Sequence, residues 1–193
     1  MSRETLSHLN TQTLIGYTDK RGHAWHYRAG EQGAEPNHYP SAIPAGDVAR
    51  RLFSWEPVVC PLQAVLIDEN GVETITDDTR QVIVRPDTKT VLGVFSTGYR
   101  VHHYGQWLVE NVERILDTDE LAIGSAGLLR GGAVAWVQIE MEDTLTVAGV
   151  EFRPFLTTAT SLDGSLATTY QVGSKVIVCD NTSSAATGEH TSQ

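Results

Sequence analysis

The sequence predicts an α+β fold in which antiparallel strand meanders pack with one or two helices, preceded by a small N-terminal hairpin unit. From residue 58 onward, short apolar and β-branched runs are separated by turns rich in Gly, Asp and Pro, a pattern typical of successive antiparallel strands. Helical spacing of apolar residues occurs in only two stretches. The 193 residues can build one substantial core with a small appendage, so we expect a hairpin and linker at 1–40 and an α+β domain at 41–193.

The N-terminal unit is predicted from the stretch "TLIGYTDKRGHAWHYRA". One strand would carry Tyr17 and the next would carry Trp25 and Tyr27, on either side of a turn at 19–22. Aromatic side chains are enriched at interface hot spots, so this hairpin is a candidate partner-binding surface. Alternatively, the three aromatic rings close one end of the core.

Two helices are expected in the main domain. The first begins near Pro44 and ends before Pro57, with Leu52 and Trp55 on one face. The second covers residues 104–116, where apolar residues recur at helical spacing.

The strands of the main domain are separated by turns at 68–71, 86–89, 130–132 and 163–164. The Gly-Gly of the third turn could in principle cradle a phosphate, but a hairpin turn accounts for both glycines. The chain then continues through the strand-like runs "PFLTTATS", "SLATTYQV" and "KVIVC".

The excess of acidic over basic residues makes binding to bare nucleic acid unfavourable. The chain has 14 Lys and Arg against 24 Asp and Glu, a formal net charge of −10. Proteins that neutralise phosphates depend on a basic surface, and an acidic chain favours a protein partner instead. No apolar run is long enough for a membrane span, and the polar start does not resemble a secretory signal. The two cysteines, Cys60 and Cys179, are too few for a disulfide framework, so we expect a reducing cytoplasm.

The sequence does not predict a catalytic or metal site. It lacks a Gly-Lys-Ser/Thr phosphate loop, a His-Glu-x-x-His helix and a Cys-x-x-Cys pair. His23 and His26 lie in a strand-like segment, where positions three apart face opposite ways and do not share a metal. His102 and His103 precede the second helix, where capping or a surface role is expected. We therefore expect no enzyme activity, no cofactor and no metal.

The stretch "KVIVCDNTSSAA" ends an apolar strand in four polar or reactive residues. A nucleophilic Cys179 would need a neighbouring base and a positive environment, but its neighbours are Asp180 and apolar side chains. We predict that Cys179 is buried and unreactive, and that Asn181 or Thr182 caps a following helix or fixes a turn.

Four segments together resemble the phage/plasmid-like protein family: "IPAGDVARRLFSWEPV", "VLGVFSTGYRVHHYGQWLVENVERIL", "GSAGLLRGGAVAWVQIEM" and "FLTTATSLDGSLATTYQVGSKVIVCDNTSSAA". The resemblance covers about residues 40–193. Two positions depart from the family pattern, which has His where this chain has Leu162 and Arg where it has Val176. The family-motif positions carried over are Tyr99, Gly131, Gly132, Asp163, Gly164, Ser165, Cys179, Asn181 and Thr182.

The resemblance implies a phage or plasmid origin and a bacterial cytoplasm, but no reaction. The first hypothesis is a non-enzymatic accessory protein that binds another protein of phage or plasmid DNA metabolism, such as a recombinase whose direction it alters. The alternative is a single-stranded DNA binding or annealing protein, of the Rad52 type by analogy of fold. Its stacking and phosphate contacts would come from Trp25, Tyr27, Tyr99, Arg100 and Trp107. An enzyme acting on nucleotides or nucleic acid is the third and least favoured class.

Overall fold

The computed structural model describes residues 13–17, 35, 37–69, 71–115, 121–141, 145–148 and 150–176. Within these residues the strands form two separate sheets. The strands of the larger, central sheet are β1 (Thr13–Tyr17), β2 (His38–Tyr39), β6 (Leu121–Leu129), β7 (Val134–Met141), β8 (Leu145–Val147), β9 (Val150–Ser161) and β10 (Thr169–Val176). The smaller sheet consists of β3 (Val58–Asp68), β4 (Gly71–Arg85) and β5 (Thr90–Ser96).

The central sheet has the order β10-β9-β7-β6-β1-β2, and β8 pairs with β9 outside this path. Its pairs are antiparallel except β1 with β2, which is parallel. The β6–β7 hairpin closes at the pair Leu129–Val134 through a short 3-10 turn, η2 (Arg130–Gly132). Gly131 and Gly132 have positive φ values of 68° and 103°, which explains why this turn needs glycine.

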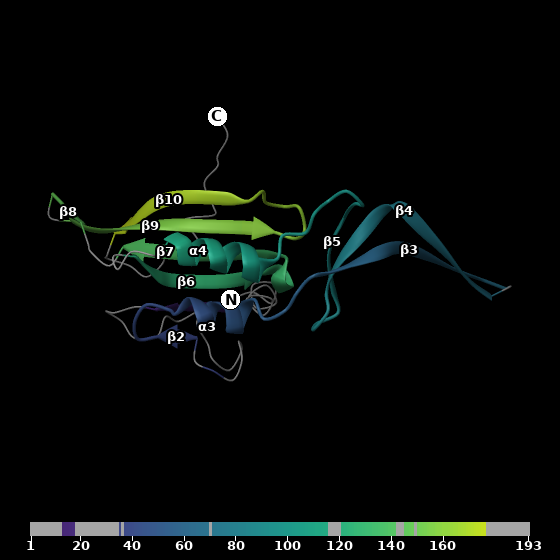
Figure 1. Ribbon diagram of the computed structural model, residues 1–193, viewed down its shortest axis with the longest axis horizontal. Helices are drawn as coiled ribbons and strands as arrows, with labels where there is room; N and C mark the ends of the chain where they lie inside the picture. The colour runs from purple at the N-terminus through teal and green to yellow at the C-terminus, as the bar shows by residue number, and fades with distance from the viewer. Residues whose placement is uncertain are drawn as a thin grey trace, which may run out of the picture.

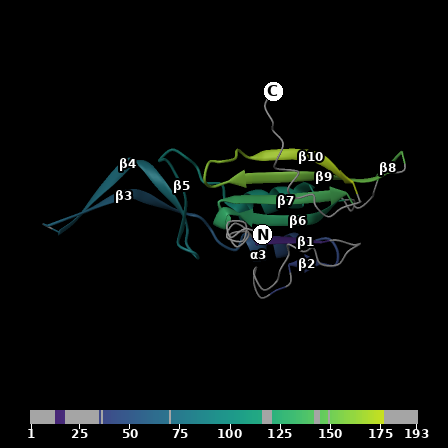
Figure 2. The same cartoon turned by 180° about the vertical axis from the view of Figure 1, so that it is seen from behind.

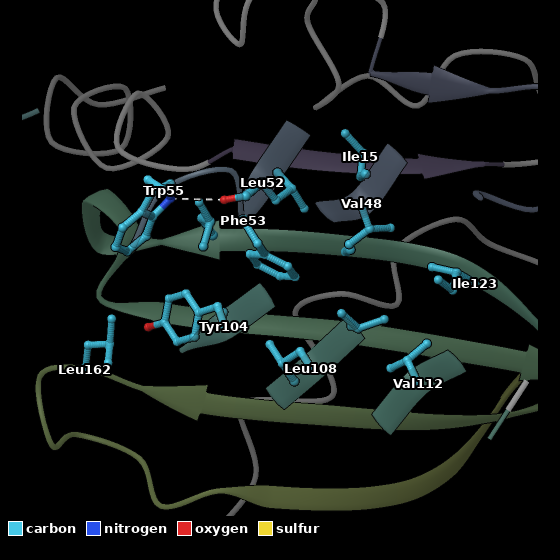
Figure 3. Packing of buried hydrophobic residues seen from close by; sticks show 14 of the residues in the cluster. Ile15, Val48, Leu52, Phe53, Trp55, Tyr104, Leu108, Val112, Ile123 and Leu162 are labelled. Atoms are coloured by element: carbon cyan, nitrogen blue, oxygen red, sulfur yellow. Dashed lines mark hydrogen bonds between the residues drawn. The ribbon is translucent and has the colours of Figure 1, made fainter. Parts of the chain in front are cut away.

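Helices lie on one face of the central sheet, and Figure 2 shows the strands in front of them when the molecule is seen from behind. They are α3 (Ala45–Leu52) and a π-helical turn, η1 (Gly105–Val109), that continues into α4 (Glu110–Ile115). Their apolar side chains pack against inward-facing residues of β1, β6 and β7 (Figure 3). The fully buried members include Ile15, Leu52, Leu108, Val137 and Leu162.

Aromatic rings close the end of this core nearest the smaller sheet. Tyr104 lies 5.8 Å from Phe53 and 5.7 Å from Trp55 between ring centroids, and the Trp55 contact is edge-on. The Trp55 indole donates a hydrogen bond to the Leu52 carbonyl at 3.1 Å, so the ring is fixed against the end of α3 (Figure 3).

The face of the central sheet away from the helices holds a buried polar group. Glu140 Oε1 accepts a hydrogen bond from Gln138 Nε2 at 2.9 Å, and Glu140 Oε2 lies 3.8 Å from Arg153 Nη1. A side chain at Gly124 would meet the Glu140 carboxylate at 2.4 Å, so the glycine makes room for it. A buried charge is tolerated when it is paired and hydrogen-bonded, and this cluster therefore has a structural explanation.

The smaller sheet projects from one end of the molecule, opposite the end where β8 lies (Figure 1). Its base, where β4 pairs with β5, packs on the body through Ile83 and Leu92, which are buried. Beyond that base only β3 and β4 continue, as a long twisted ribbon (Figure 1).

The prediction of a strand-rich α+β fold with antiparallel meanders and few helices is confirmed. The predicted N-terminal hairpin is not confirmed: its first strand, β1, pairs with β6 in the central sheet, and its expected second strand lies outside the described residues. Strand β3 ends at Asp68 and β4 begins at Gly71, so these two strands meet at the turn predicted at 68–71. No helix among the described residues is long and apolar enough to cross a membrane.

Candidate functional site

The ribbon beyond the base of the smaller sheet, residues 62–69 and 71–79, is named the distal arm here. It pairs Leu62 with Asp77 at one end and Asp68 with Gly71 at the other. Its apolar side chains are exposed on both faces: Val65, Ile67 and Val72 on one face are 58%, 79% and 70% exposed, and Leu66 and Ile75 on the other are each 50% exposed. The distal arm therefore extends away from the body without burying its own apolar side chains.

A two-stranded ribbon of this kind is unusual as a free structure. Isolated hairpins are marginally stable in water, and a sheet normally needs a third strand or a packed face. Contiguous exposed apolar side chains on a folded protein mark interaction sites more often than chance. Among the described residues nothing packs against the outer face of Ile67 or Val72, which suits a surface that is covered by another molecule.

All charged side chains of the distal arm are acidic. Between residues 58 and 79 the chain has Asp68, Glu69, Glu73, Asp77 and Asp78 but no Lys or Arg. Two of these acids have local roles, because Asp68 accepts from the Gly71 N–H at 3.1 Å and Asp77 accepts from the Thr79 N–H at 2.8 Å. A surface of this charge repels phosphates and attracts basic groups.

The base of the arm meets two loops of the central sheet at a place named the joint, which contains Arg85, the η2 turn and the loop at 162–166. The Arg85 guanidinium lies 4.5 Å from the centre of the Trp55 ring and donates to the Gly131 carbonyl at 3.1 Å. It also forms a bidentate ion pair with Asp87, with both N···O distances at 2.8 Å. The hydrogen bond from Arg85 holds the pKa of Asp87 below its ordinary value. One cation thus ties the arm to the body.

Backbone bonds hold the two loops of the joint together. The Ala133 carbonyl accepts hydrogen bonds from the Leu162 N–H at 2.7 Å and from the Tyr104 hydroxyl at 2.8 Å. Burial raises the pKa of Tyr104, so its hydroxyl stays protonated as a donor. Because Leu162 is fully buried, the loop that follows it is fixed at its first residue.

Asp163 is the charged residue of the second loop. Its carboxylate accepts from the Ser165 N–H at 2.8 Å and from Arg130 Nη1 at 3.2 Å. Burial favours the neutral acid, but the hydrogen bonds from Ser165 and Arg130 outweigh it and lower the pKa of Asp163. The turn at Gly164, with φ of 75°, follows directly.

Strand β5 packs closely on the same loop. A side chain at Gly93 would lie 2.7 Å from the Leu162 carbonyl oxygen, so only glycine allows β5 to approach this near. The Phe95 ring lies against Gly164 and stacks on Tyr99, with ring centroids 4.1 Å apart and planes at 14°. The joint therefore holds the arm through close backbone contact as well as through Arg85.

The described residues bring together no catalytic constellation. They contain no group of three or more His, Cys, Asp and Glu that could hold a metal. His103 contacts the Glu56 carboxylate through Nδ1, and its carbonyl accepts from the Trp107 N–H at 2.8 Å at the start of the helix. These contacts give His103 a structural role at the start of the helix.

Six of the predicted family-motif positions meet at the joint. Gly131 and Gly132 form the η2 turn, Asp163, Gly164 and Ser165 form the second loop, and Tyr99 stacks on the base of the arm through Phe95. Tyr17 ends β1, and its side chain is not described. The remaining candidates lie outside the described residues: Trp25, Tyr27, Cys179, Asn181 and Thr182.

The distal arm itself is missing from the sequence-based candidates. Its signal in the sequence is the run "VETIT" at 72–76, whose β-branched residues favour a strand and directly follow a turn.

Comparison with known proteins gives one family. A family model described as "Domain of unknown function (DUF932)" matches residues 91–193, from β5 through β10 and beyond. The match therefore includes both loops of the joint, while the distal arm precedes it. No curated protein and no solved structure matches the chain.

Proposed function

The chain belongs to the DUF932 family, and from this premise we propose that it is a non-enzymatic accessory protein that acts by binding another protein. The observation that carries the proposal is the distal arm, a ribbon that projects from the body with Val65, Ile67 and Val72 exposed (Figure 1). Exposed apolar side chains favour association because their burial removes them from water.

We place this activity in phage or plasmid DNA metabolism within a bacterial cytoplasm. This part of the proposal is supported by the four ordered segments that resemble phage/plasmid-like proteins. A concrete form is a recombination directionality factor, a protein that binds a recombinase and changes the direction of its reaction. Binding more tightly to one conformation of the recombinase would be sufficient, since a ligand shifts an equilibrium by its differential affinity.

The joint supports the proposal by giving the arm a fixed direction. Arg85 is held at once by Trp55, Asp87 and the Gly131 carbonyl, so the base of the arm has little freedom to rotate. A preorganised arm loses less conformational entropy when it is bound. The predicted N-terminal contact through Tyr17, Trp25 and Tyr27 remains a second candidate surface.

The alternative, single-stranded DNA binding or annealing, receives less support. Tyr99 already stacks on Phe95, and the Trp107 ring lies 5.7 Å from the Tyr170 ring, so two of the expected base-stacking rings have protein neighbours. Acidic side chains on the distal arm also disfavour phosphate contact.

The test compares the full chain with a variant in which residues 63–76 are replaced by Asn-Gly. Leu62 and Asp77 are directly opposed, so a two-residue turn can join them and leave the base and joint intact. Both proteins are titrated against the recombinase encoded by the same phage or plasmid, and against a poly-dT oligonucleotide. We expect the full chain to bind the recombinase and the shortened variant to lose this binding. Equal binding by both proteins, or tight salt-sensitive binding to poly-dT, would overturn the proposal.

A further inference from the structure

The two faces of the distal arm differ in chemistry. Residues that are directly opposed in an antiparallel pair share a face, so the register sorts the side chains. One face, named the uncharged face, contains only apolar, hydroxyl and amide side chains: Gln63, Val65, Ile67, Val72, Thr74 and Thr76. The opposite face mixes apolar side chains with carboxylates: Leu62, Ala64, Leu66, Asp68, Glu73, Ile75 and Asp77.

The uncharged face is the part of the arm best suited to burial. It carries Ile67 and Val72, which are directly opposed and are 79% and 70% exposed. Its one described side-chain hydrogen bond joins Gln63 Nε2 to Thr76 Oγ1 at 3.2 Å, so these polar groups already satisfy each other in part. Burying this face therefore requires no carboxylate to leave water, which makes it far less costly than burying the other face.

The acids determine what can surround the buried face. Asp68, Glu69, Glu73, Asp77 and Asp78 all lie on or beside the same ribbon, and residues 58–79 contain no Lys or Arg; the first cation after them, Arg80, acts on Asp77. A second arm from another copy would bring ten carboxylates together, and a nucleic acid would add phosphates to them. A surface with Lys and Arg around an apolar groove complements both the shape and the charge of the arm.

We infer that the distal arm inserts its uncharged face into an apolar groove of a protein whose rim carries Lys and Arg. Glu69 and Asp78, at the two ends of the arm, and Glu73, on the opposite face, contribute the negative charge that attracts that rim. This inference rests on the proposed function and adds to it the chemistry of the partner surface and the face that is buried. The ribbon stands clear of the body, so a groove can enclose it from more than one side (Figures 1 and 2).

The test uses a random peptide library as the probe, selected against the immobilised full chain and counterselected against the variant with Asn-Gly in place of 63–76. We expect the selected peptides to carry Lys or Arg alternating with apolar residues. Their affinity should fall by about tenfold or more in the variant with Val65→Thr, Ile67→Thr and Val72→Thr, because apolar contact area is lost while strand propensity is kept.

Two further variants sharpen the result. Glu69→Gln, Glu73→Gln and Asp78→Asn together should weaken binding and reduce its salt dependence, while the turn-forming Asp68 and Asp77 stay in place. Val172→Thr is the matched control, since Val172 is as exposed as Ile67 but lies on β10 of the central sheet; it should leave binding unchanged.

Each contrary outcome is specific. Selected peptides that are acidic or uncharged, or no arm-dependent peptides at all, would overturn the inference. Arm-dependent binding to poly-dT would do the same in favour of nucleic acid, and an arm-dependent dimer in sedimentation would favour a second copy. If the arm is needed for recombinase binding but both triple variants bind it normally, the inference fails and the proposed function stands. If basic peptides bind the arm but the full chain does not bind the recombinase, the inference stands and the proposed function fails.

Discussion

Substitution of Gly132 by Ala tests the joint most sharply. Gly132 has a φ of 103°, a conformation that side chains rarely adopt, and it lies where the η2 turn meets the base of the arm. A Cβ at this position would lie 2.7 Å from Arg85 Nη1 and 3.1 Å from the Trp55 ring. The added methyl group would therefore push Arg85 away from both the Trp55 ring and the Gly131 carbonyl.

The expected loss can be built from its parts. Holding Ala in a sparsely populated backbone conformation costs about 1–3 kcal/mol. Displacing Arg85 removes one hydrogen bond, worth about 1 kcal/mol net. It also weakens a cation–π contact worth roughly 0.5–2 kcal/mol. Because Arg85 can relax partly, we expect Gly132→Ala to lower the free energy of unfolding by about 2–4 kcal/mol.

Two glycines provide controls in the same urea unfolding assay, followed by circular dichroism. Gly131 has a φ of 68°, but a Cβ there would lie 4.0 Å from its nearest neighbour, the Thr90 methyl group, so Gly131→Ala should cost only the backbone strain of about 1 kcal/mol. Gly46, in α3, has open space around it and no positive φ, so Gly46→Ala should stabilise by about 0.4–1 kcal/mol. If Gly132→Ala proved as mild as Gly131→Ala, the close packing of Arg85 and Trp55 against this turn would be refuted.

Three other predictions follow from the same geometry. Leu162→Ala removes a fully buried side chain and should cost about 2–5 kcal/mol in urea unfolding; a loss below about 1 kcal/mol would mean that the loop does not anchor the joint. The pKa of Asp163 is lowered in the folded protein, so its carboxylate stabilises the fold above its unfolded pKa of about 3.9, and this stability is lost as pH falls through the folded value. Asp163→Asn should therefore be less stable than the wild type at neutral pH, and the gap should narrow below about pH 4; a constant gap from neutral to acid pH would argue against the charged contacts. Replacing 63–76 by Asn-Gly should leave the melting temperature of the body nearly unchanged, because the distal arm buries little, whereas a large drop would show that the arm stabilises the fold.

The elements that follow local chemistry were predictable from the sequence. All three residues of the η2 turn, Arg130, Gly131 and Gly132, have positive φ, and the Gly131-Gly132 pair identifies the turn directly. The helical segment of η1 and α4 likewise follows from apolar spacing. The connection between β9 and β10 contains the predicted Asp163-Gly164 turn, but β10 begins at Thr169 and continues to Val176 as one strand, not as the two predicted from "SLATTYQV" and "KVIVC". In each case the sequence signal and the structural requirement lie within a few residues.

Long-range arrangements were beyond the same reasoning. Strand β1 pairs with β6, more than a hundred residues away, and no local pattern in Thr13–Tyr17 specifies that neighbour. The distal arm was missed because Glu73, Asp77 and Asp78 interrupt the apolar pattern of β4, and because alternation normally indicates a strand with one buried face. Whether both faces of a strand are exposed depends on which other elements pack against it, and a local sequence pattern does not specify those elements.

The joint shows what a family resemblance can and cannot supply. It singled out Tyr99, Gly131, Gly132, Asp163 and Gly164 as a group, without a physical reason for any of them. In the structure these residues support the base of the arm through turns, stacking and an ion pair. Their role is therefore to hold the base of the distal arm, and the arm itself comes from a part of the chain that the resemblance did not identify.

Amide hydrogen exchange measures the central claim most directly. Exchange of the full chain is recorded alone and with a saturating amount of the recombinase proposed above as its partner. The amides of residues 62–69 and 71–79 belong to an exposed ribbon and should exchange fast in the free protein. A protein-binding arm predicts that these amides become protected in the complex, while the central sheet changes little. Protection confined to the central sheet, or no protection at any residue, would contradict the account.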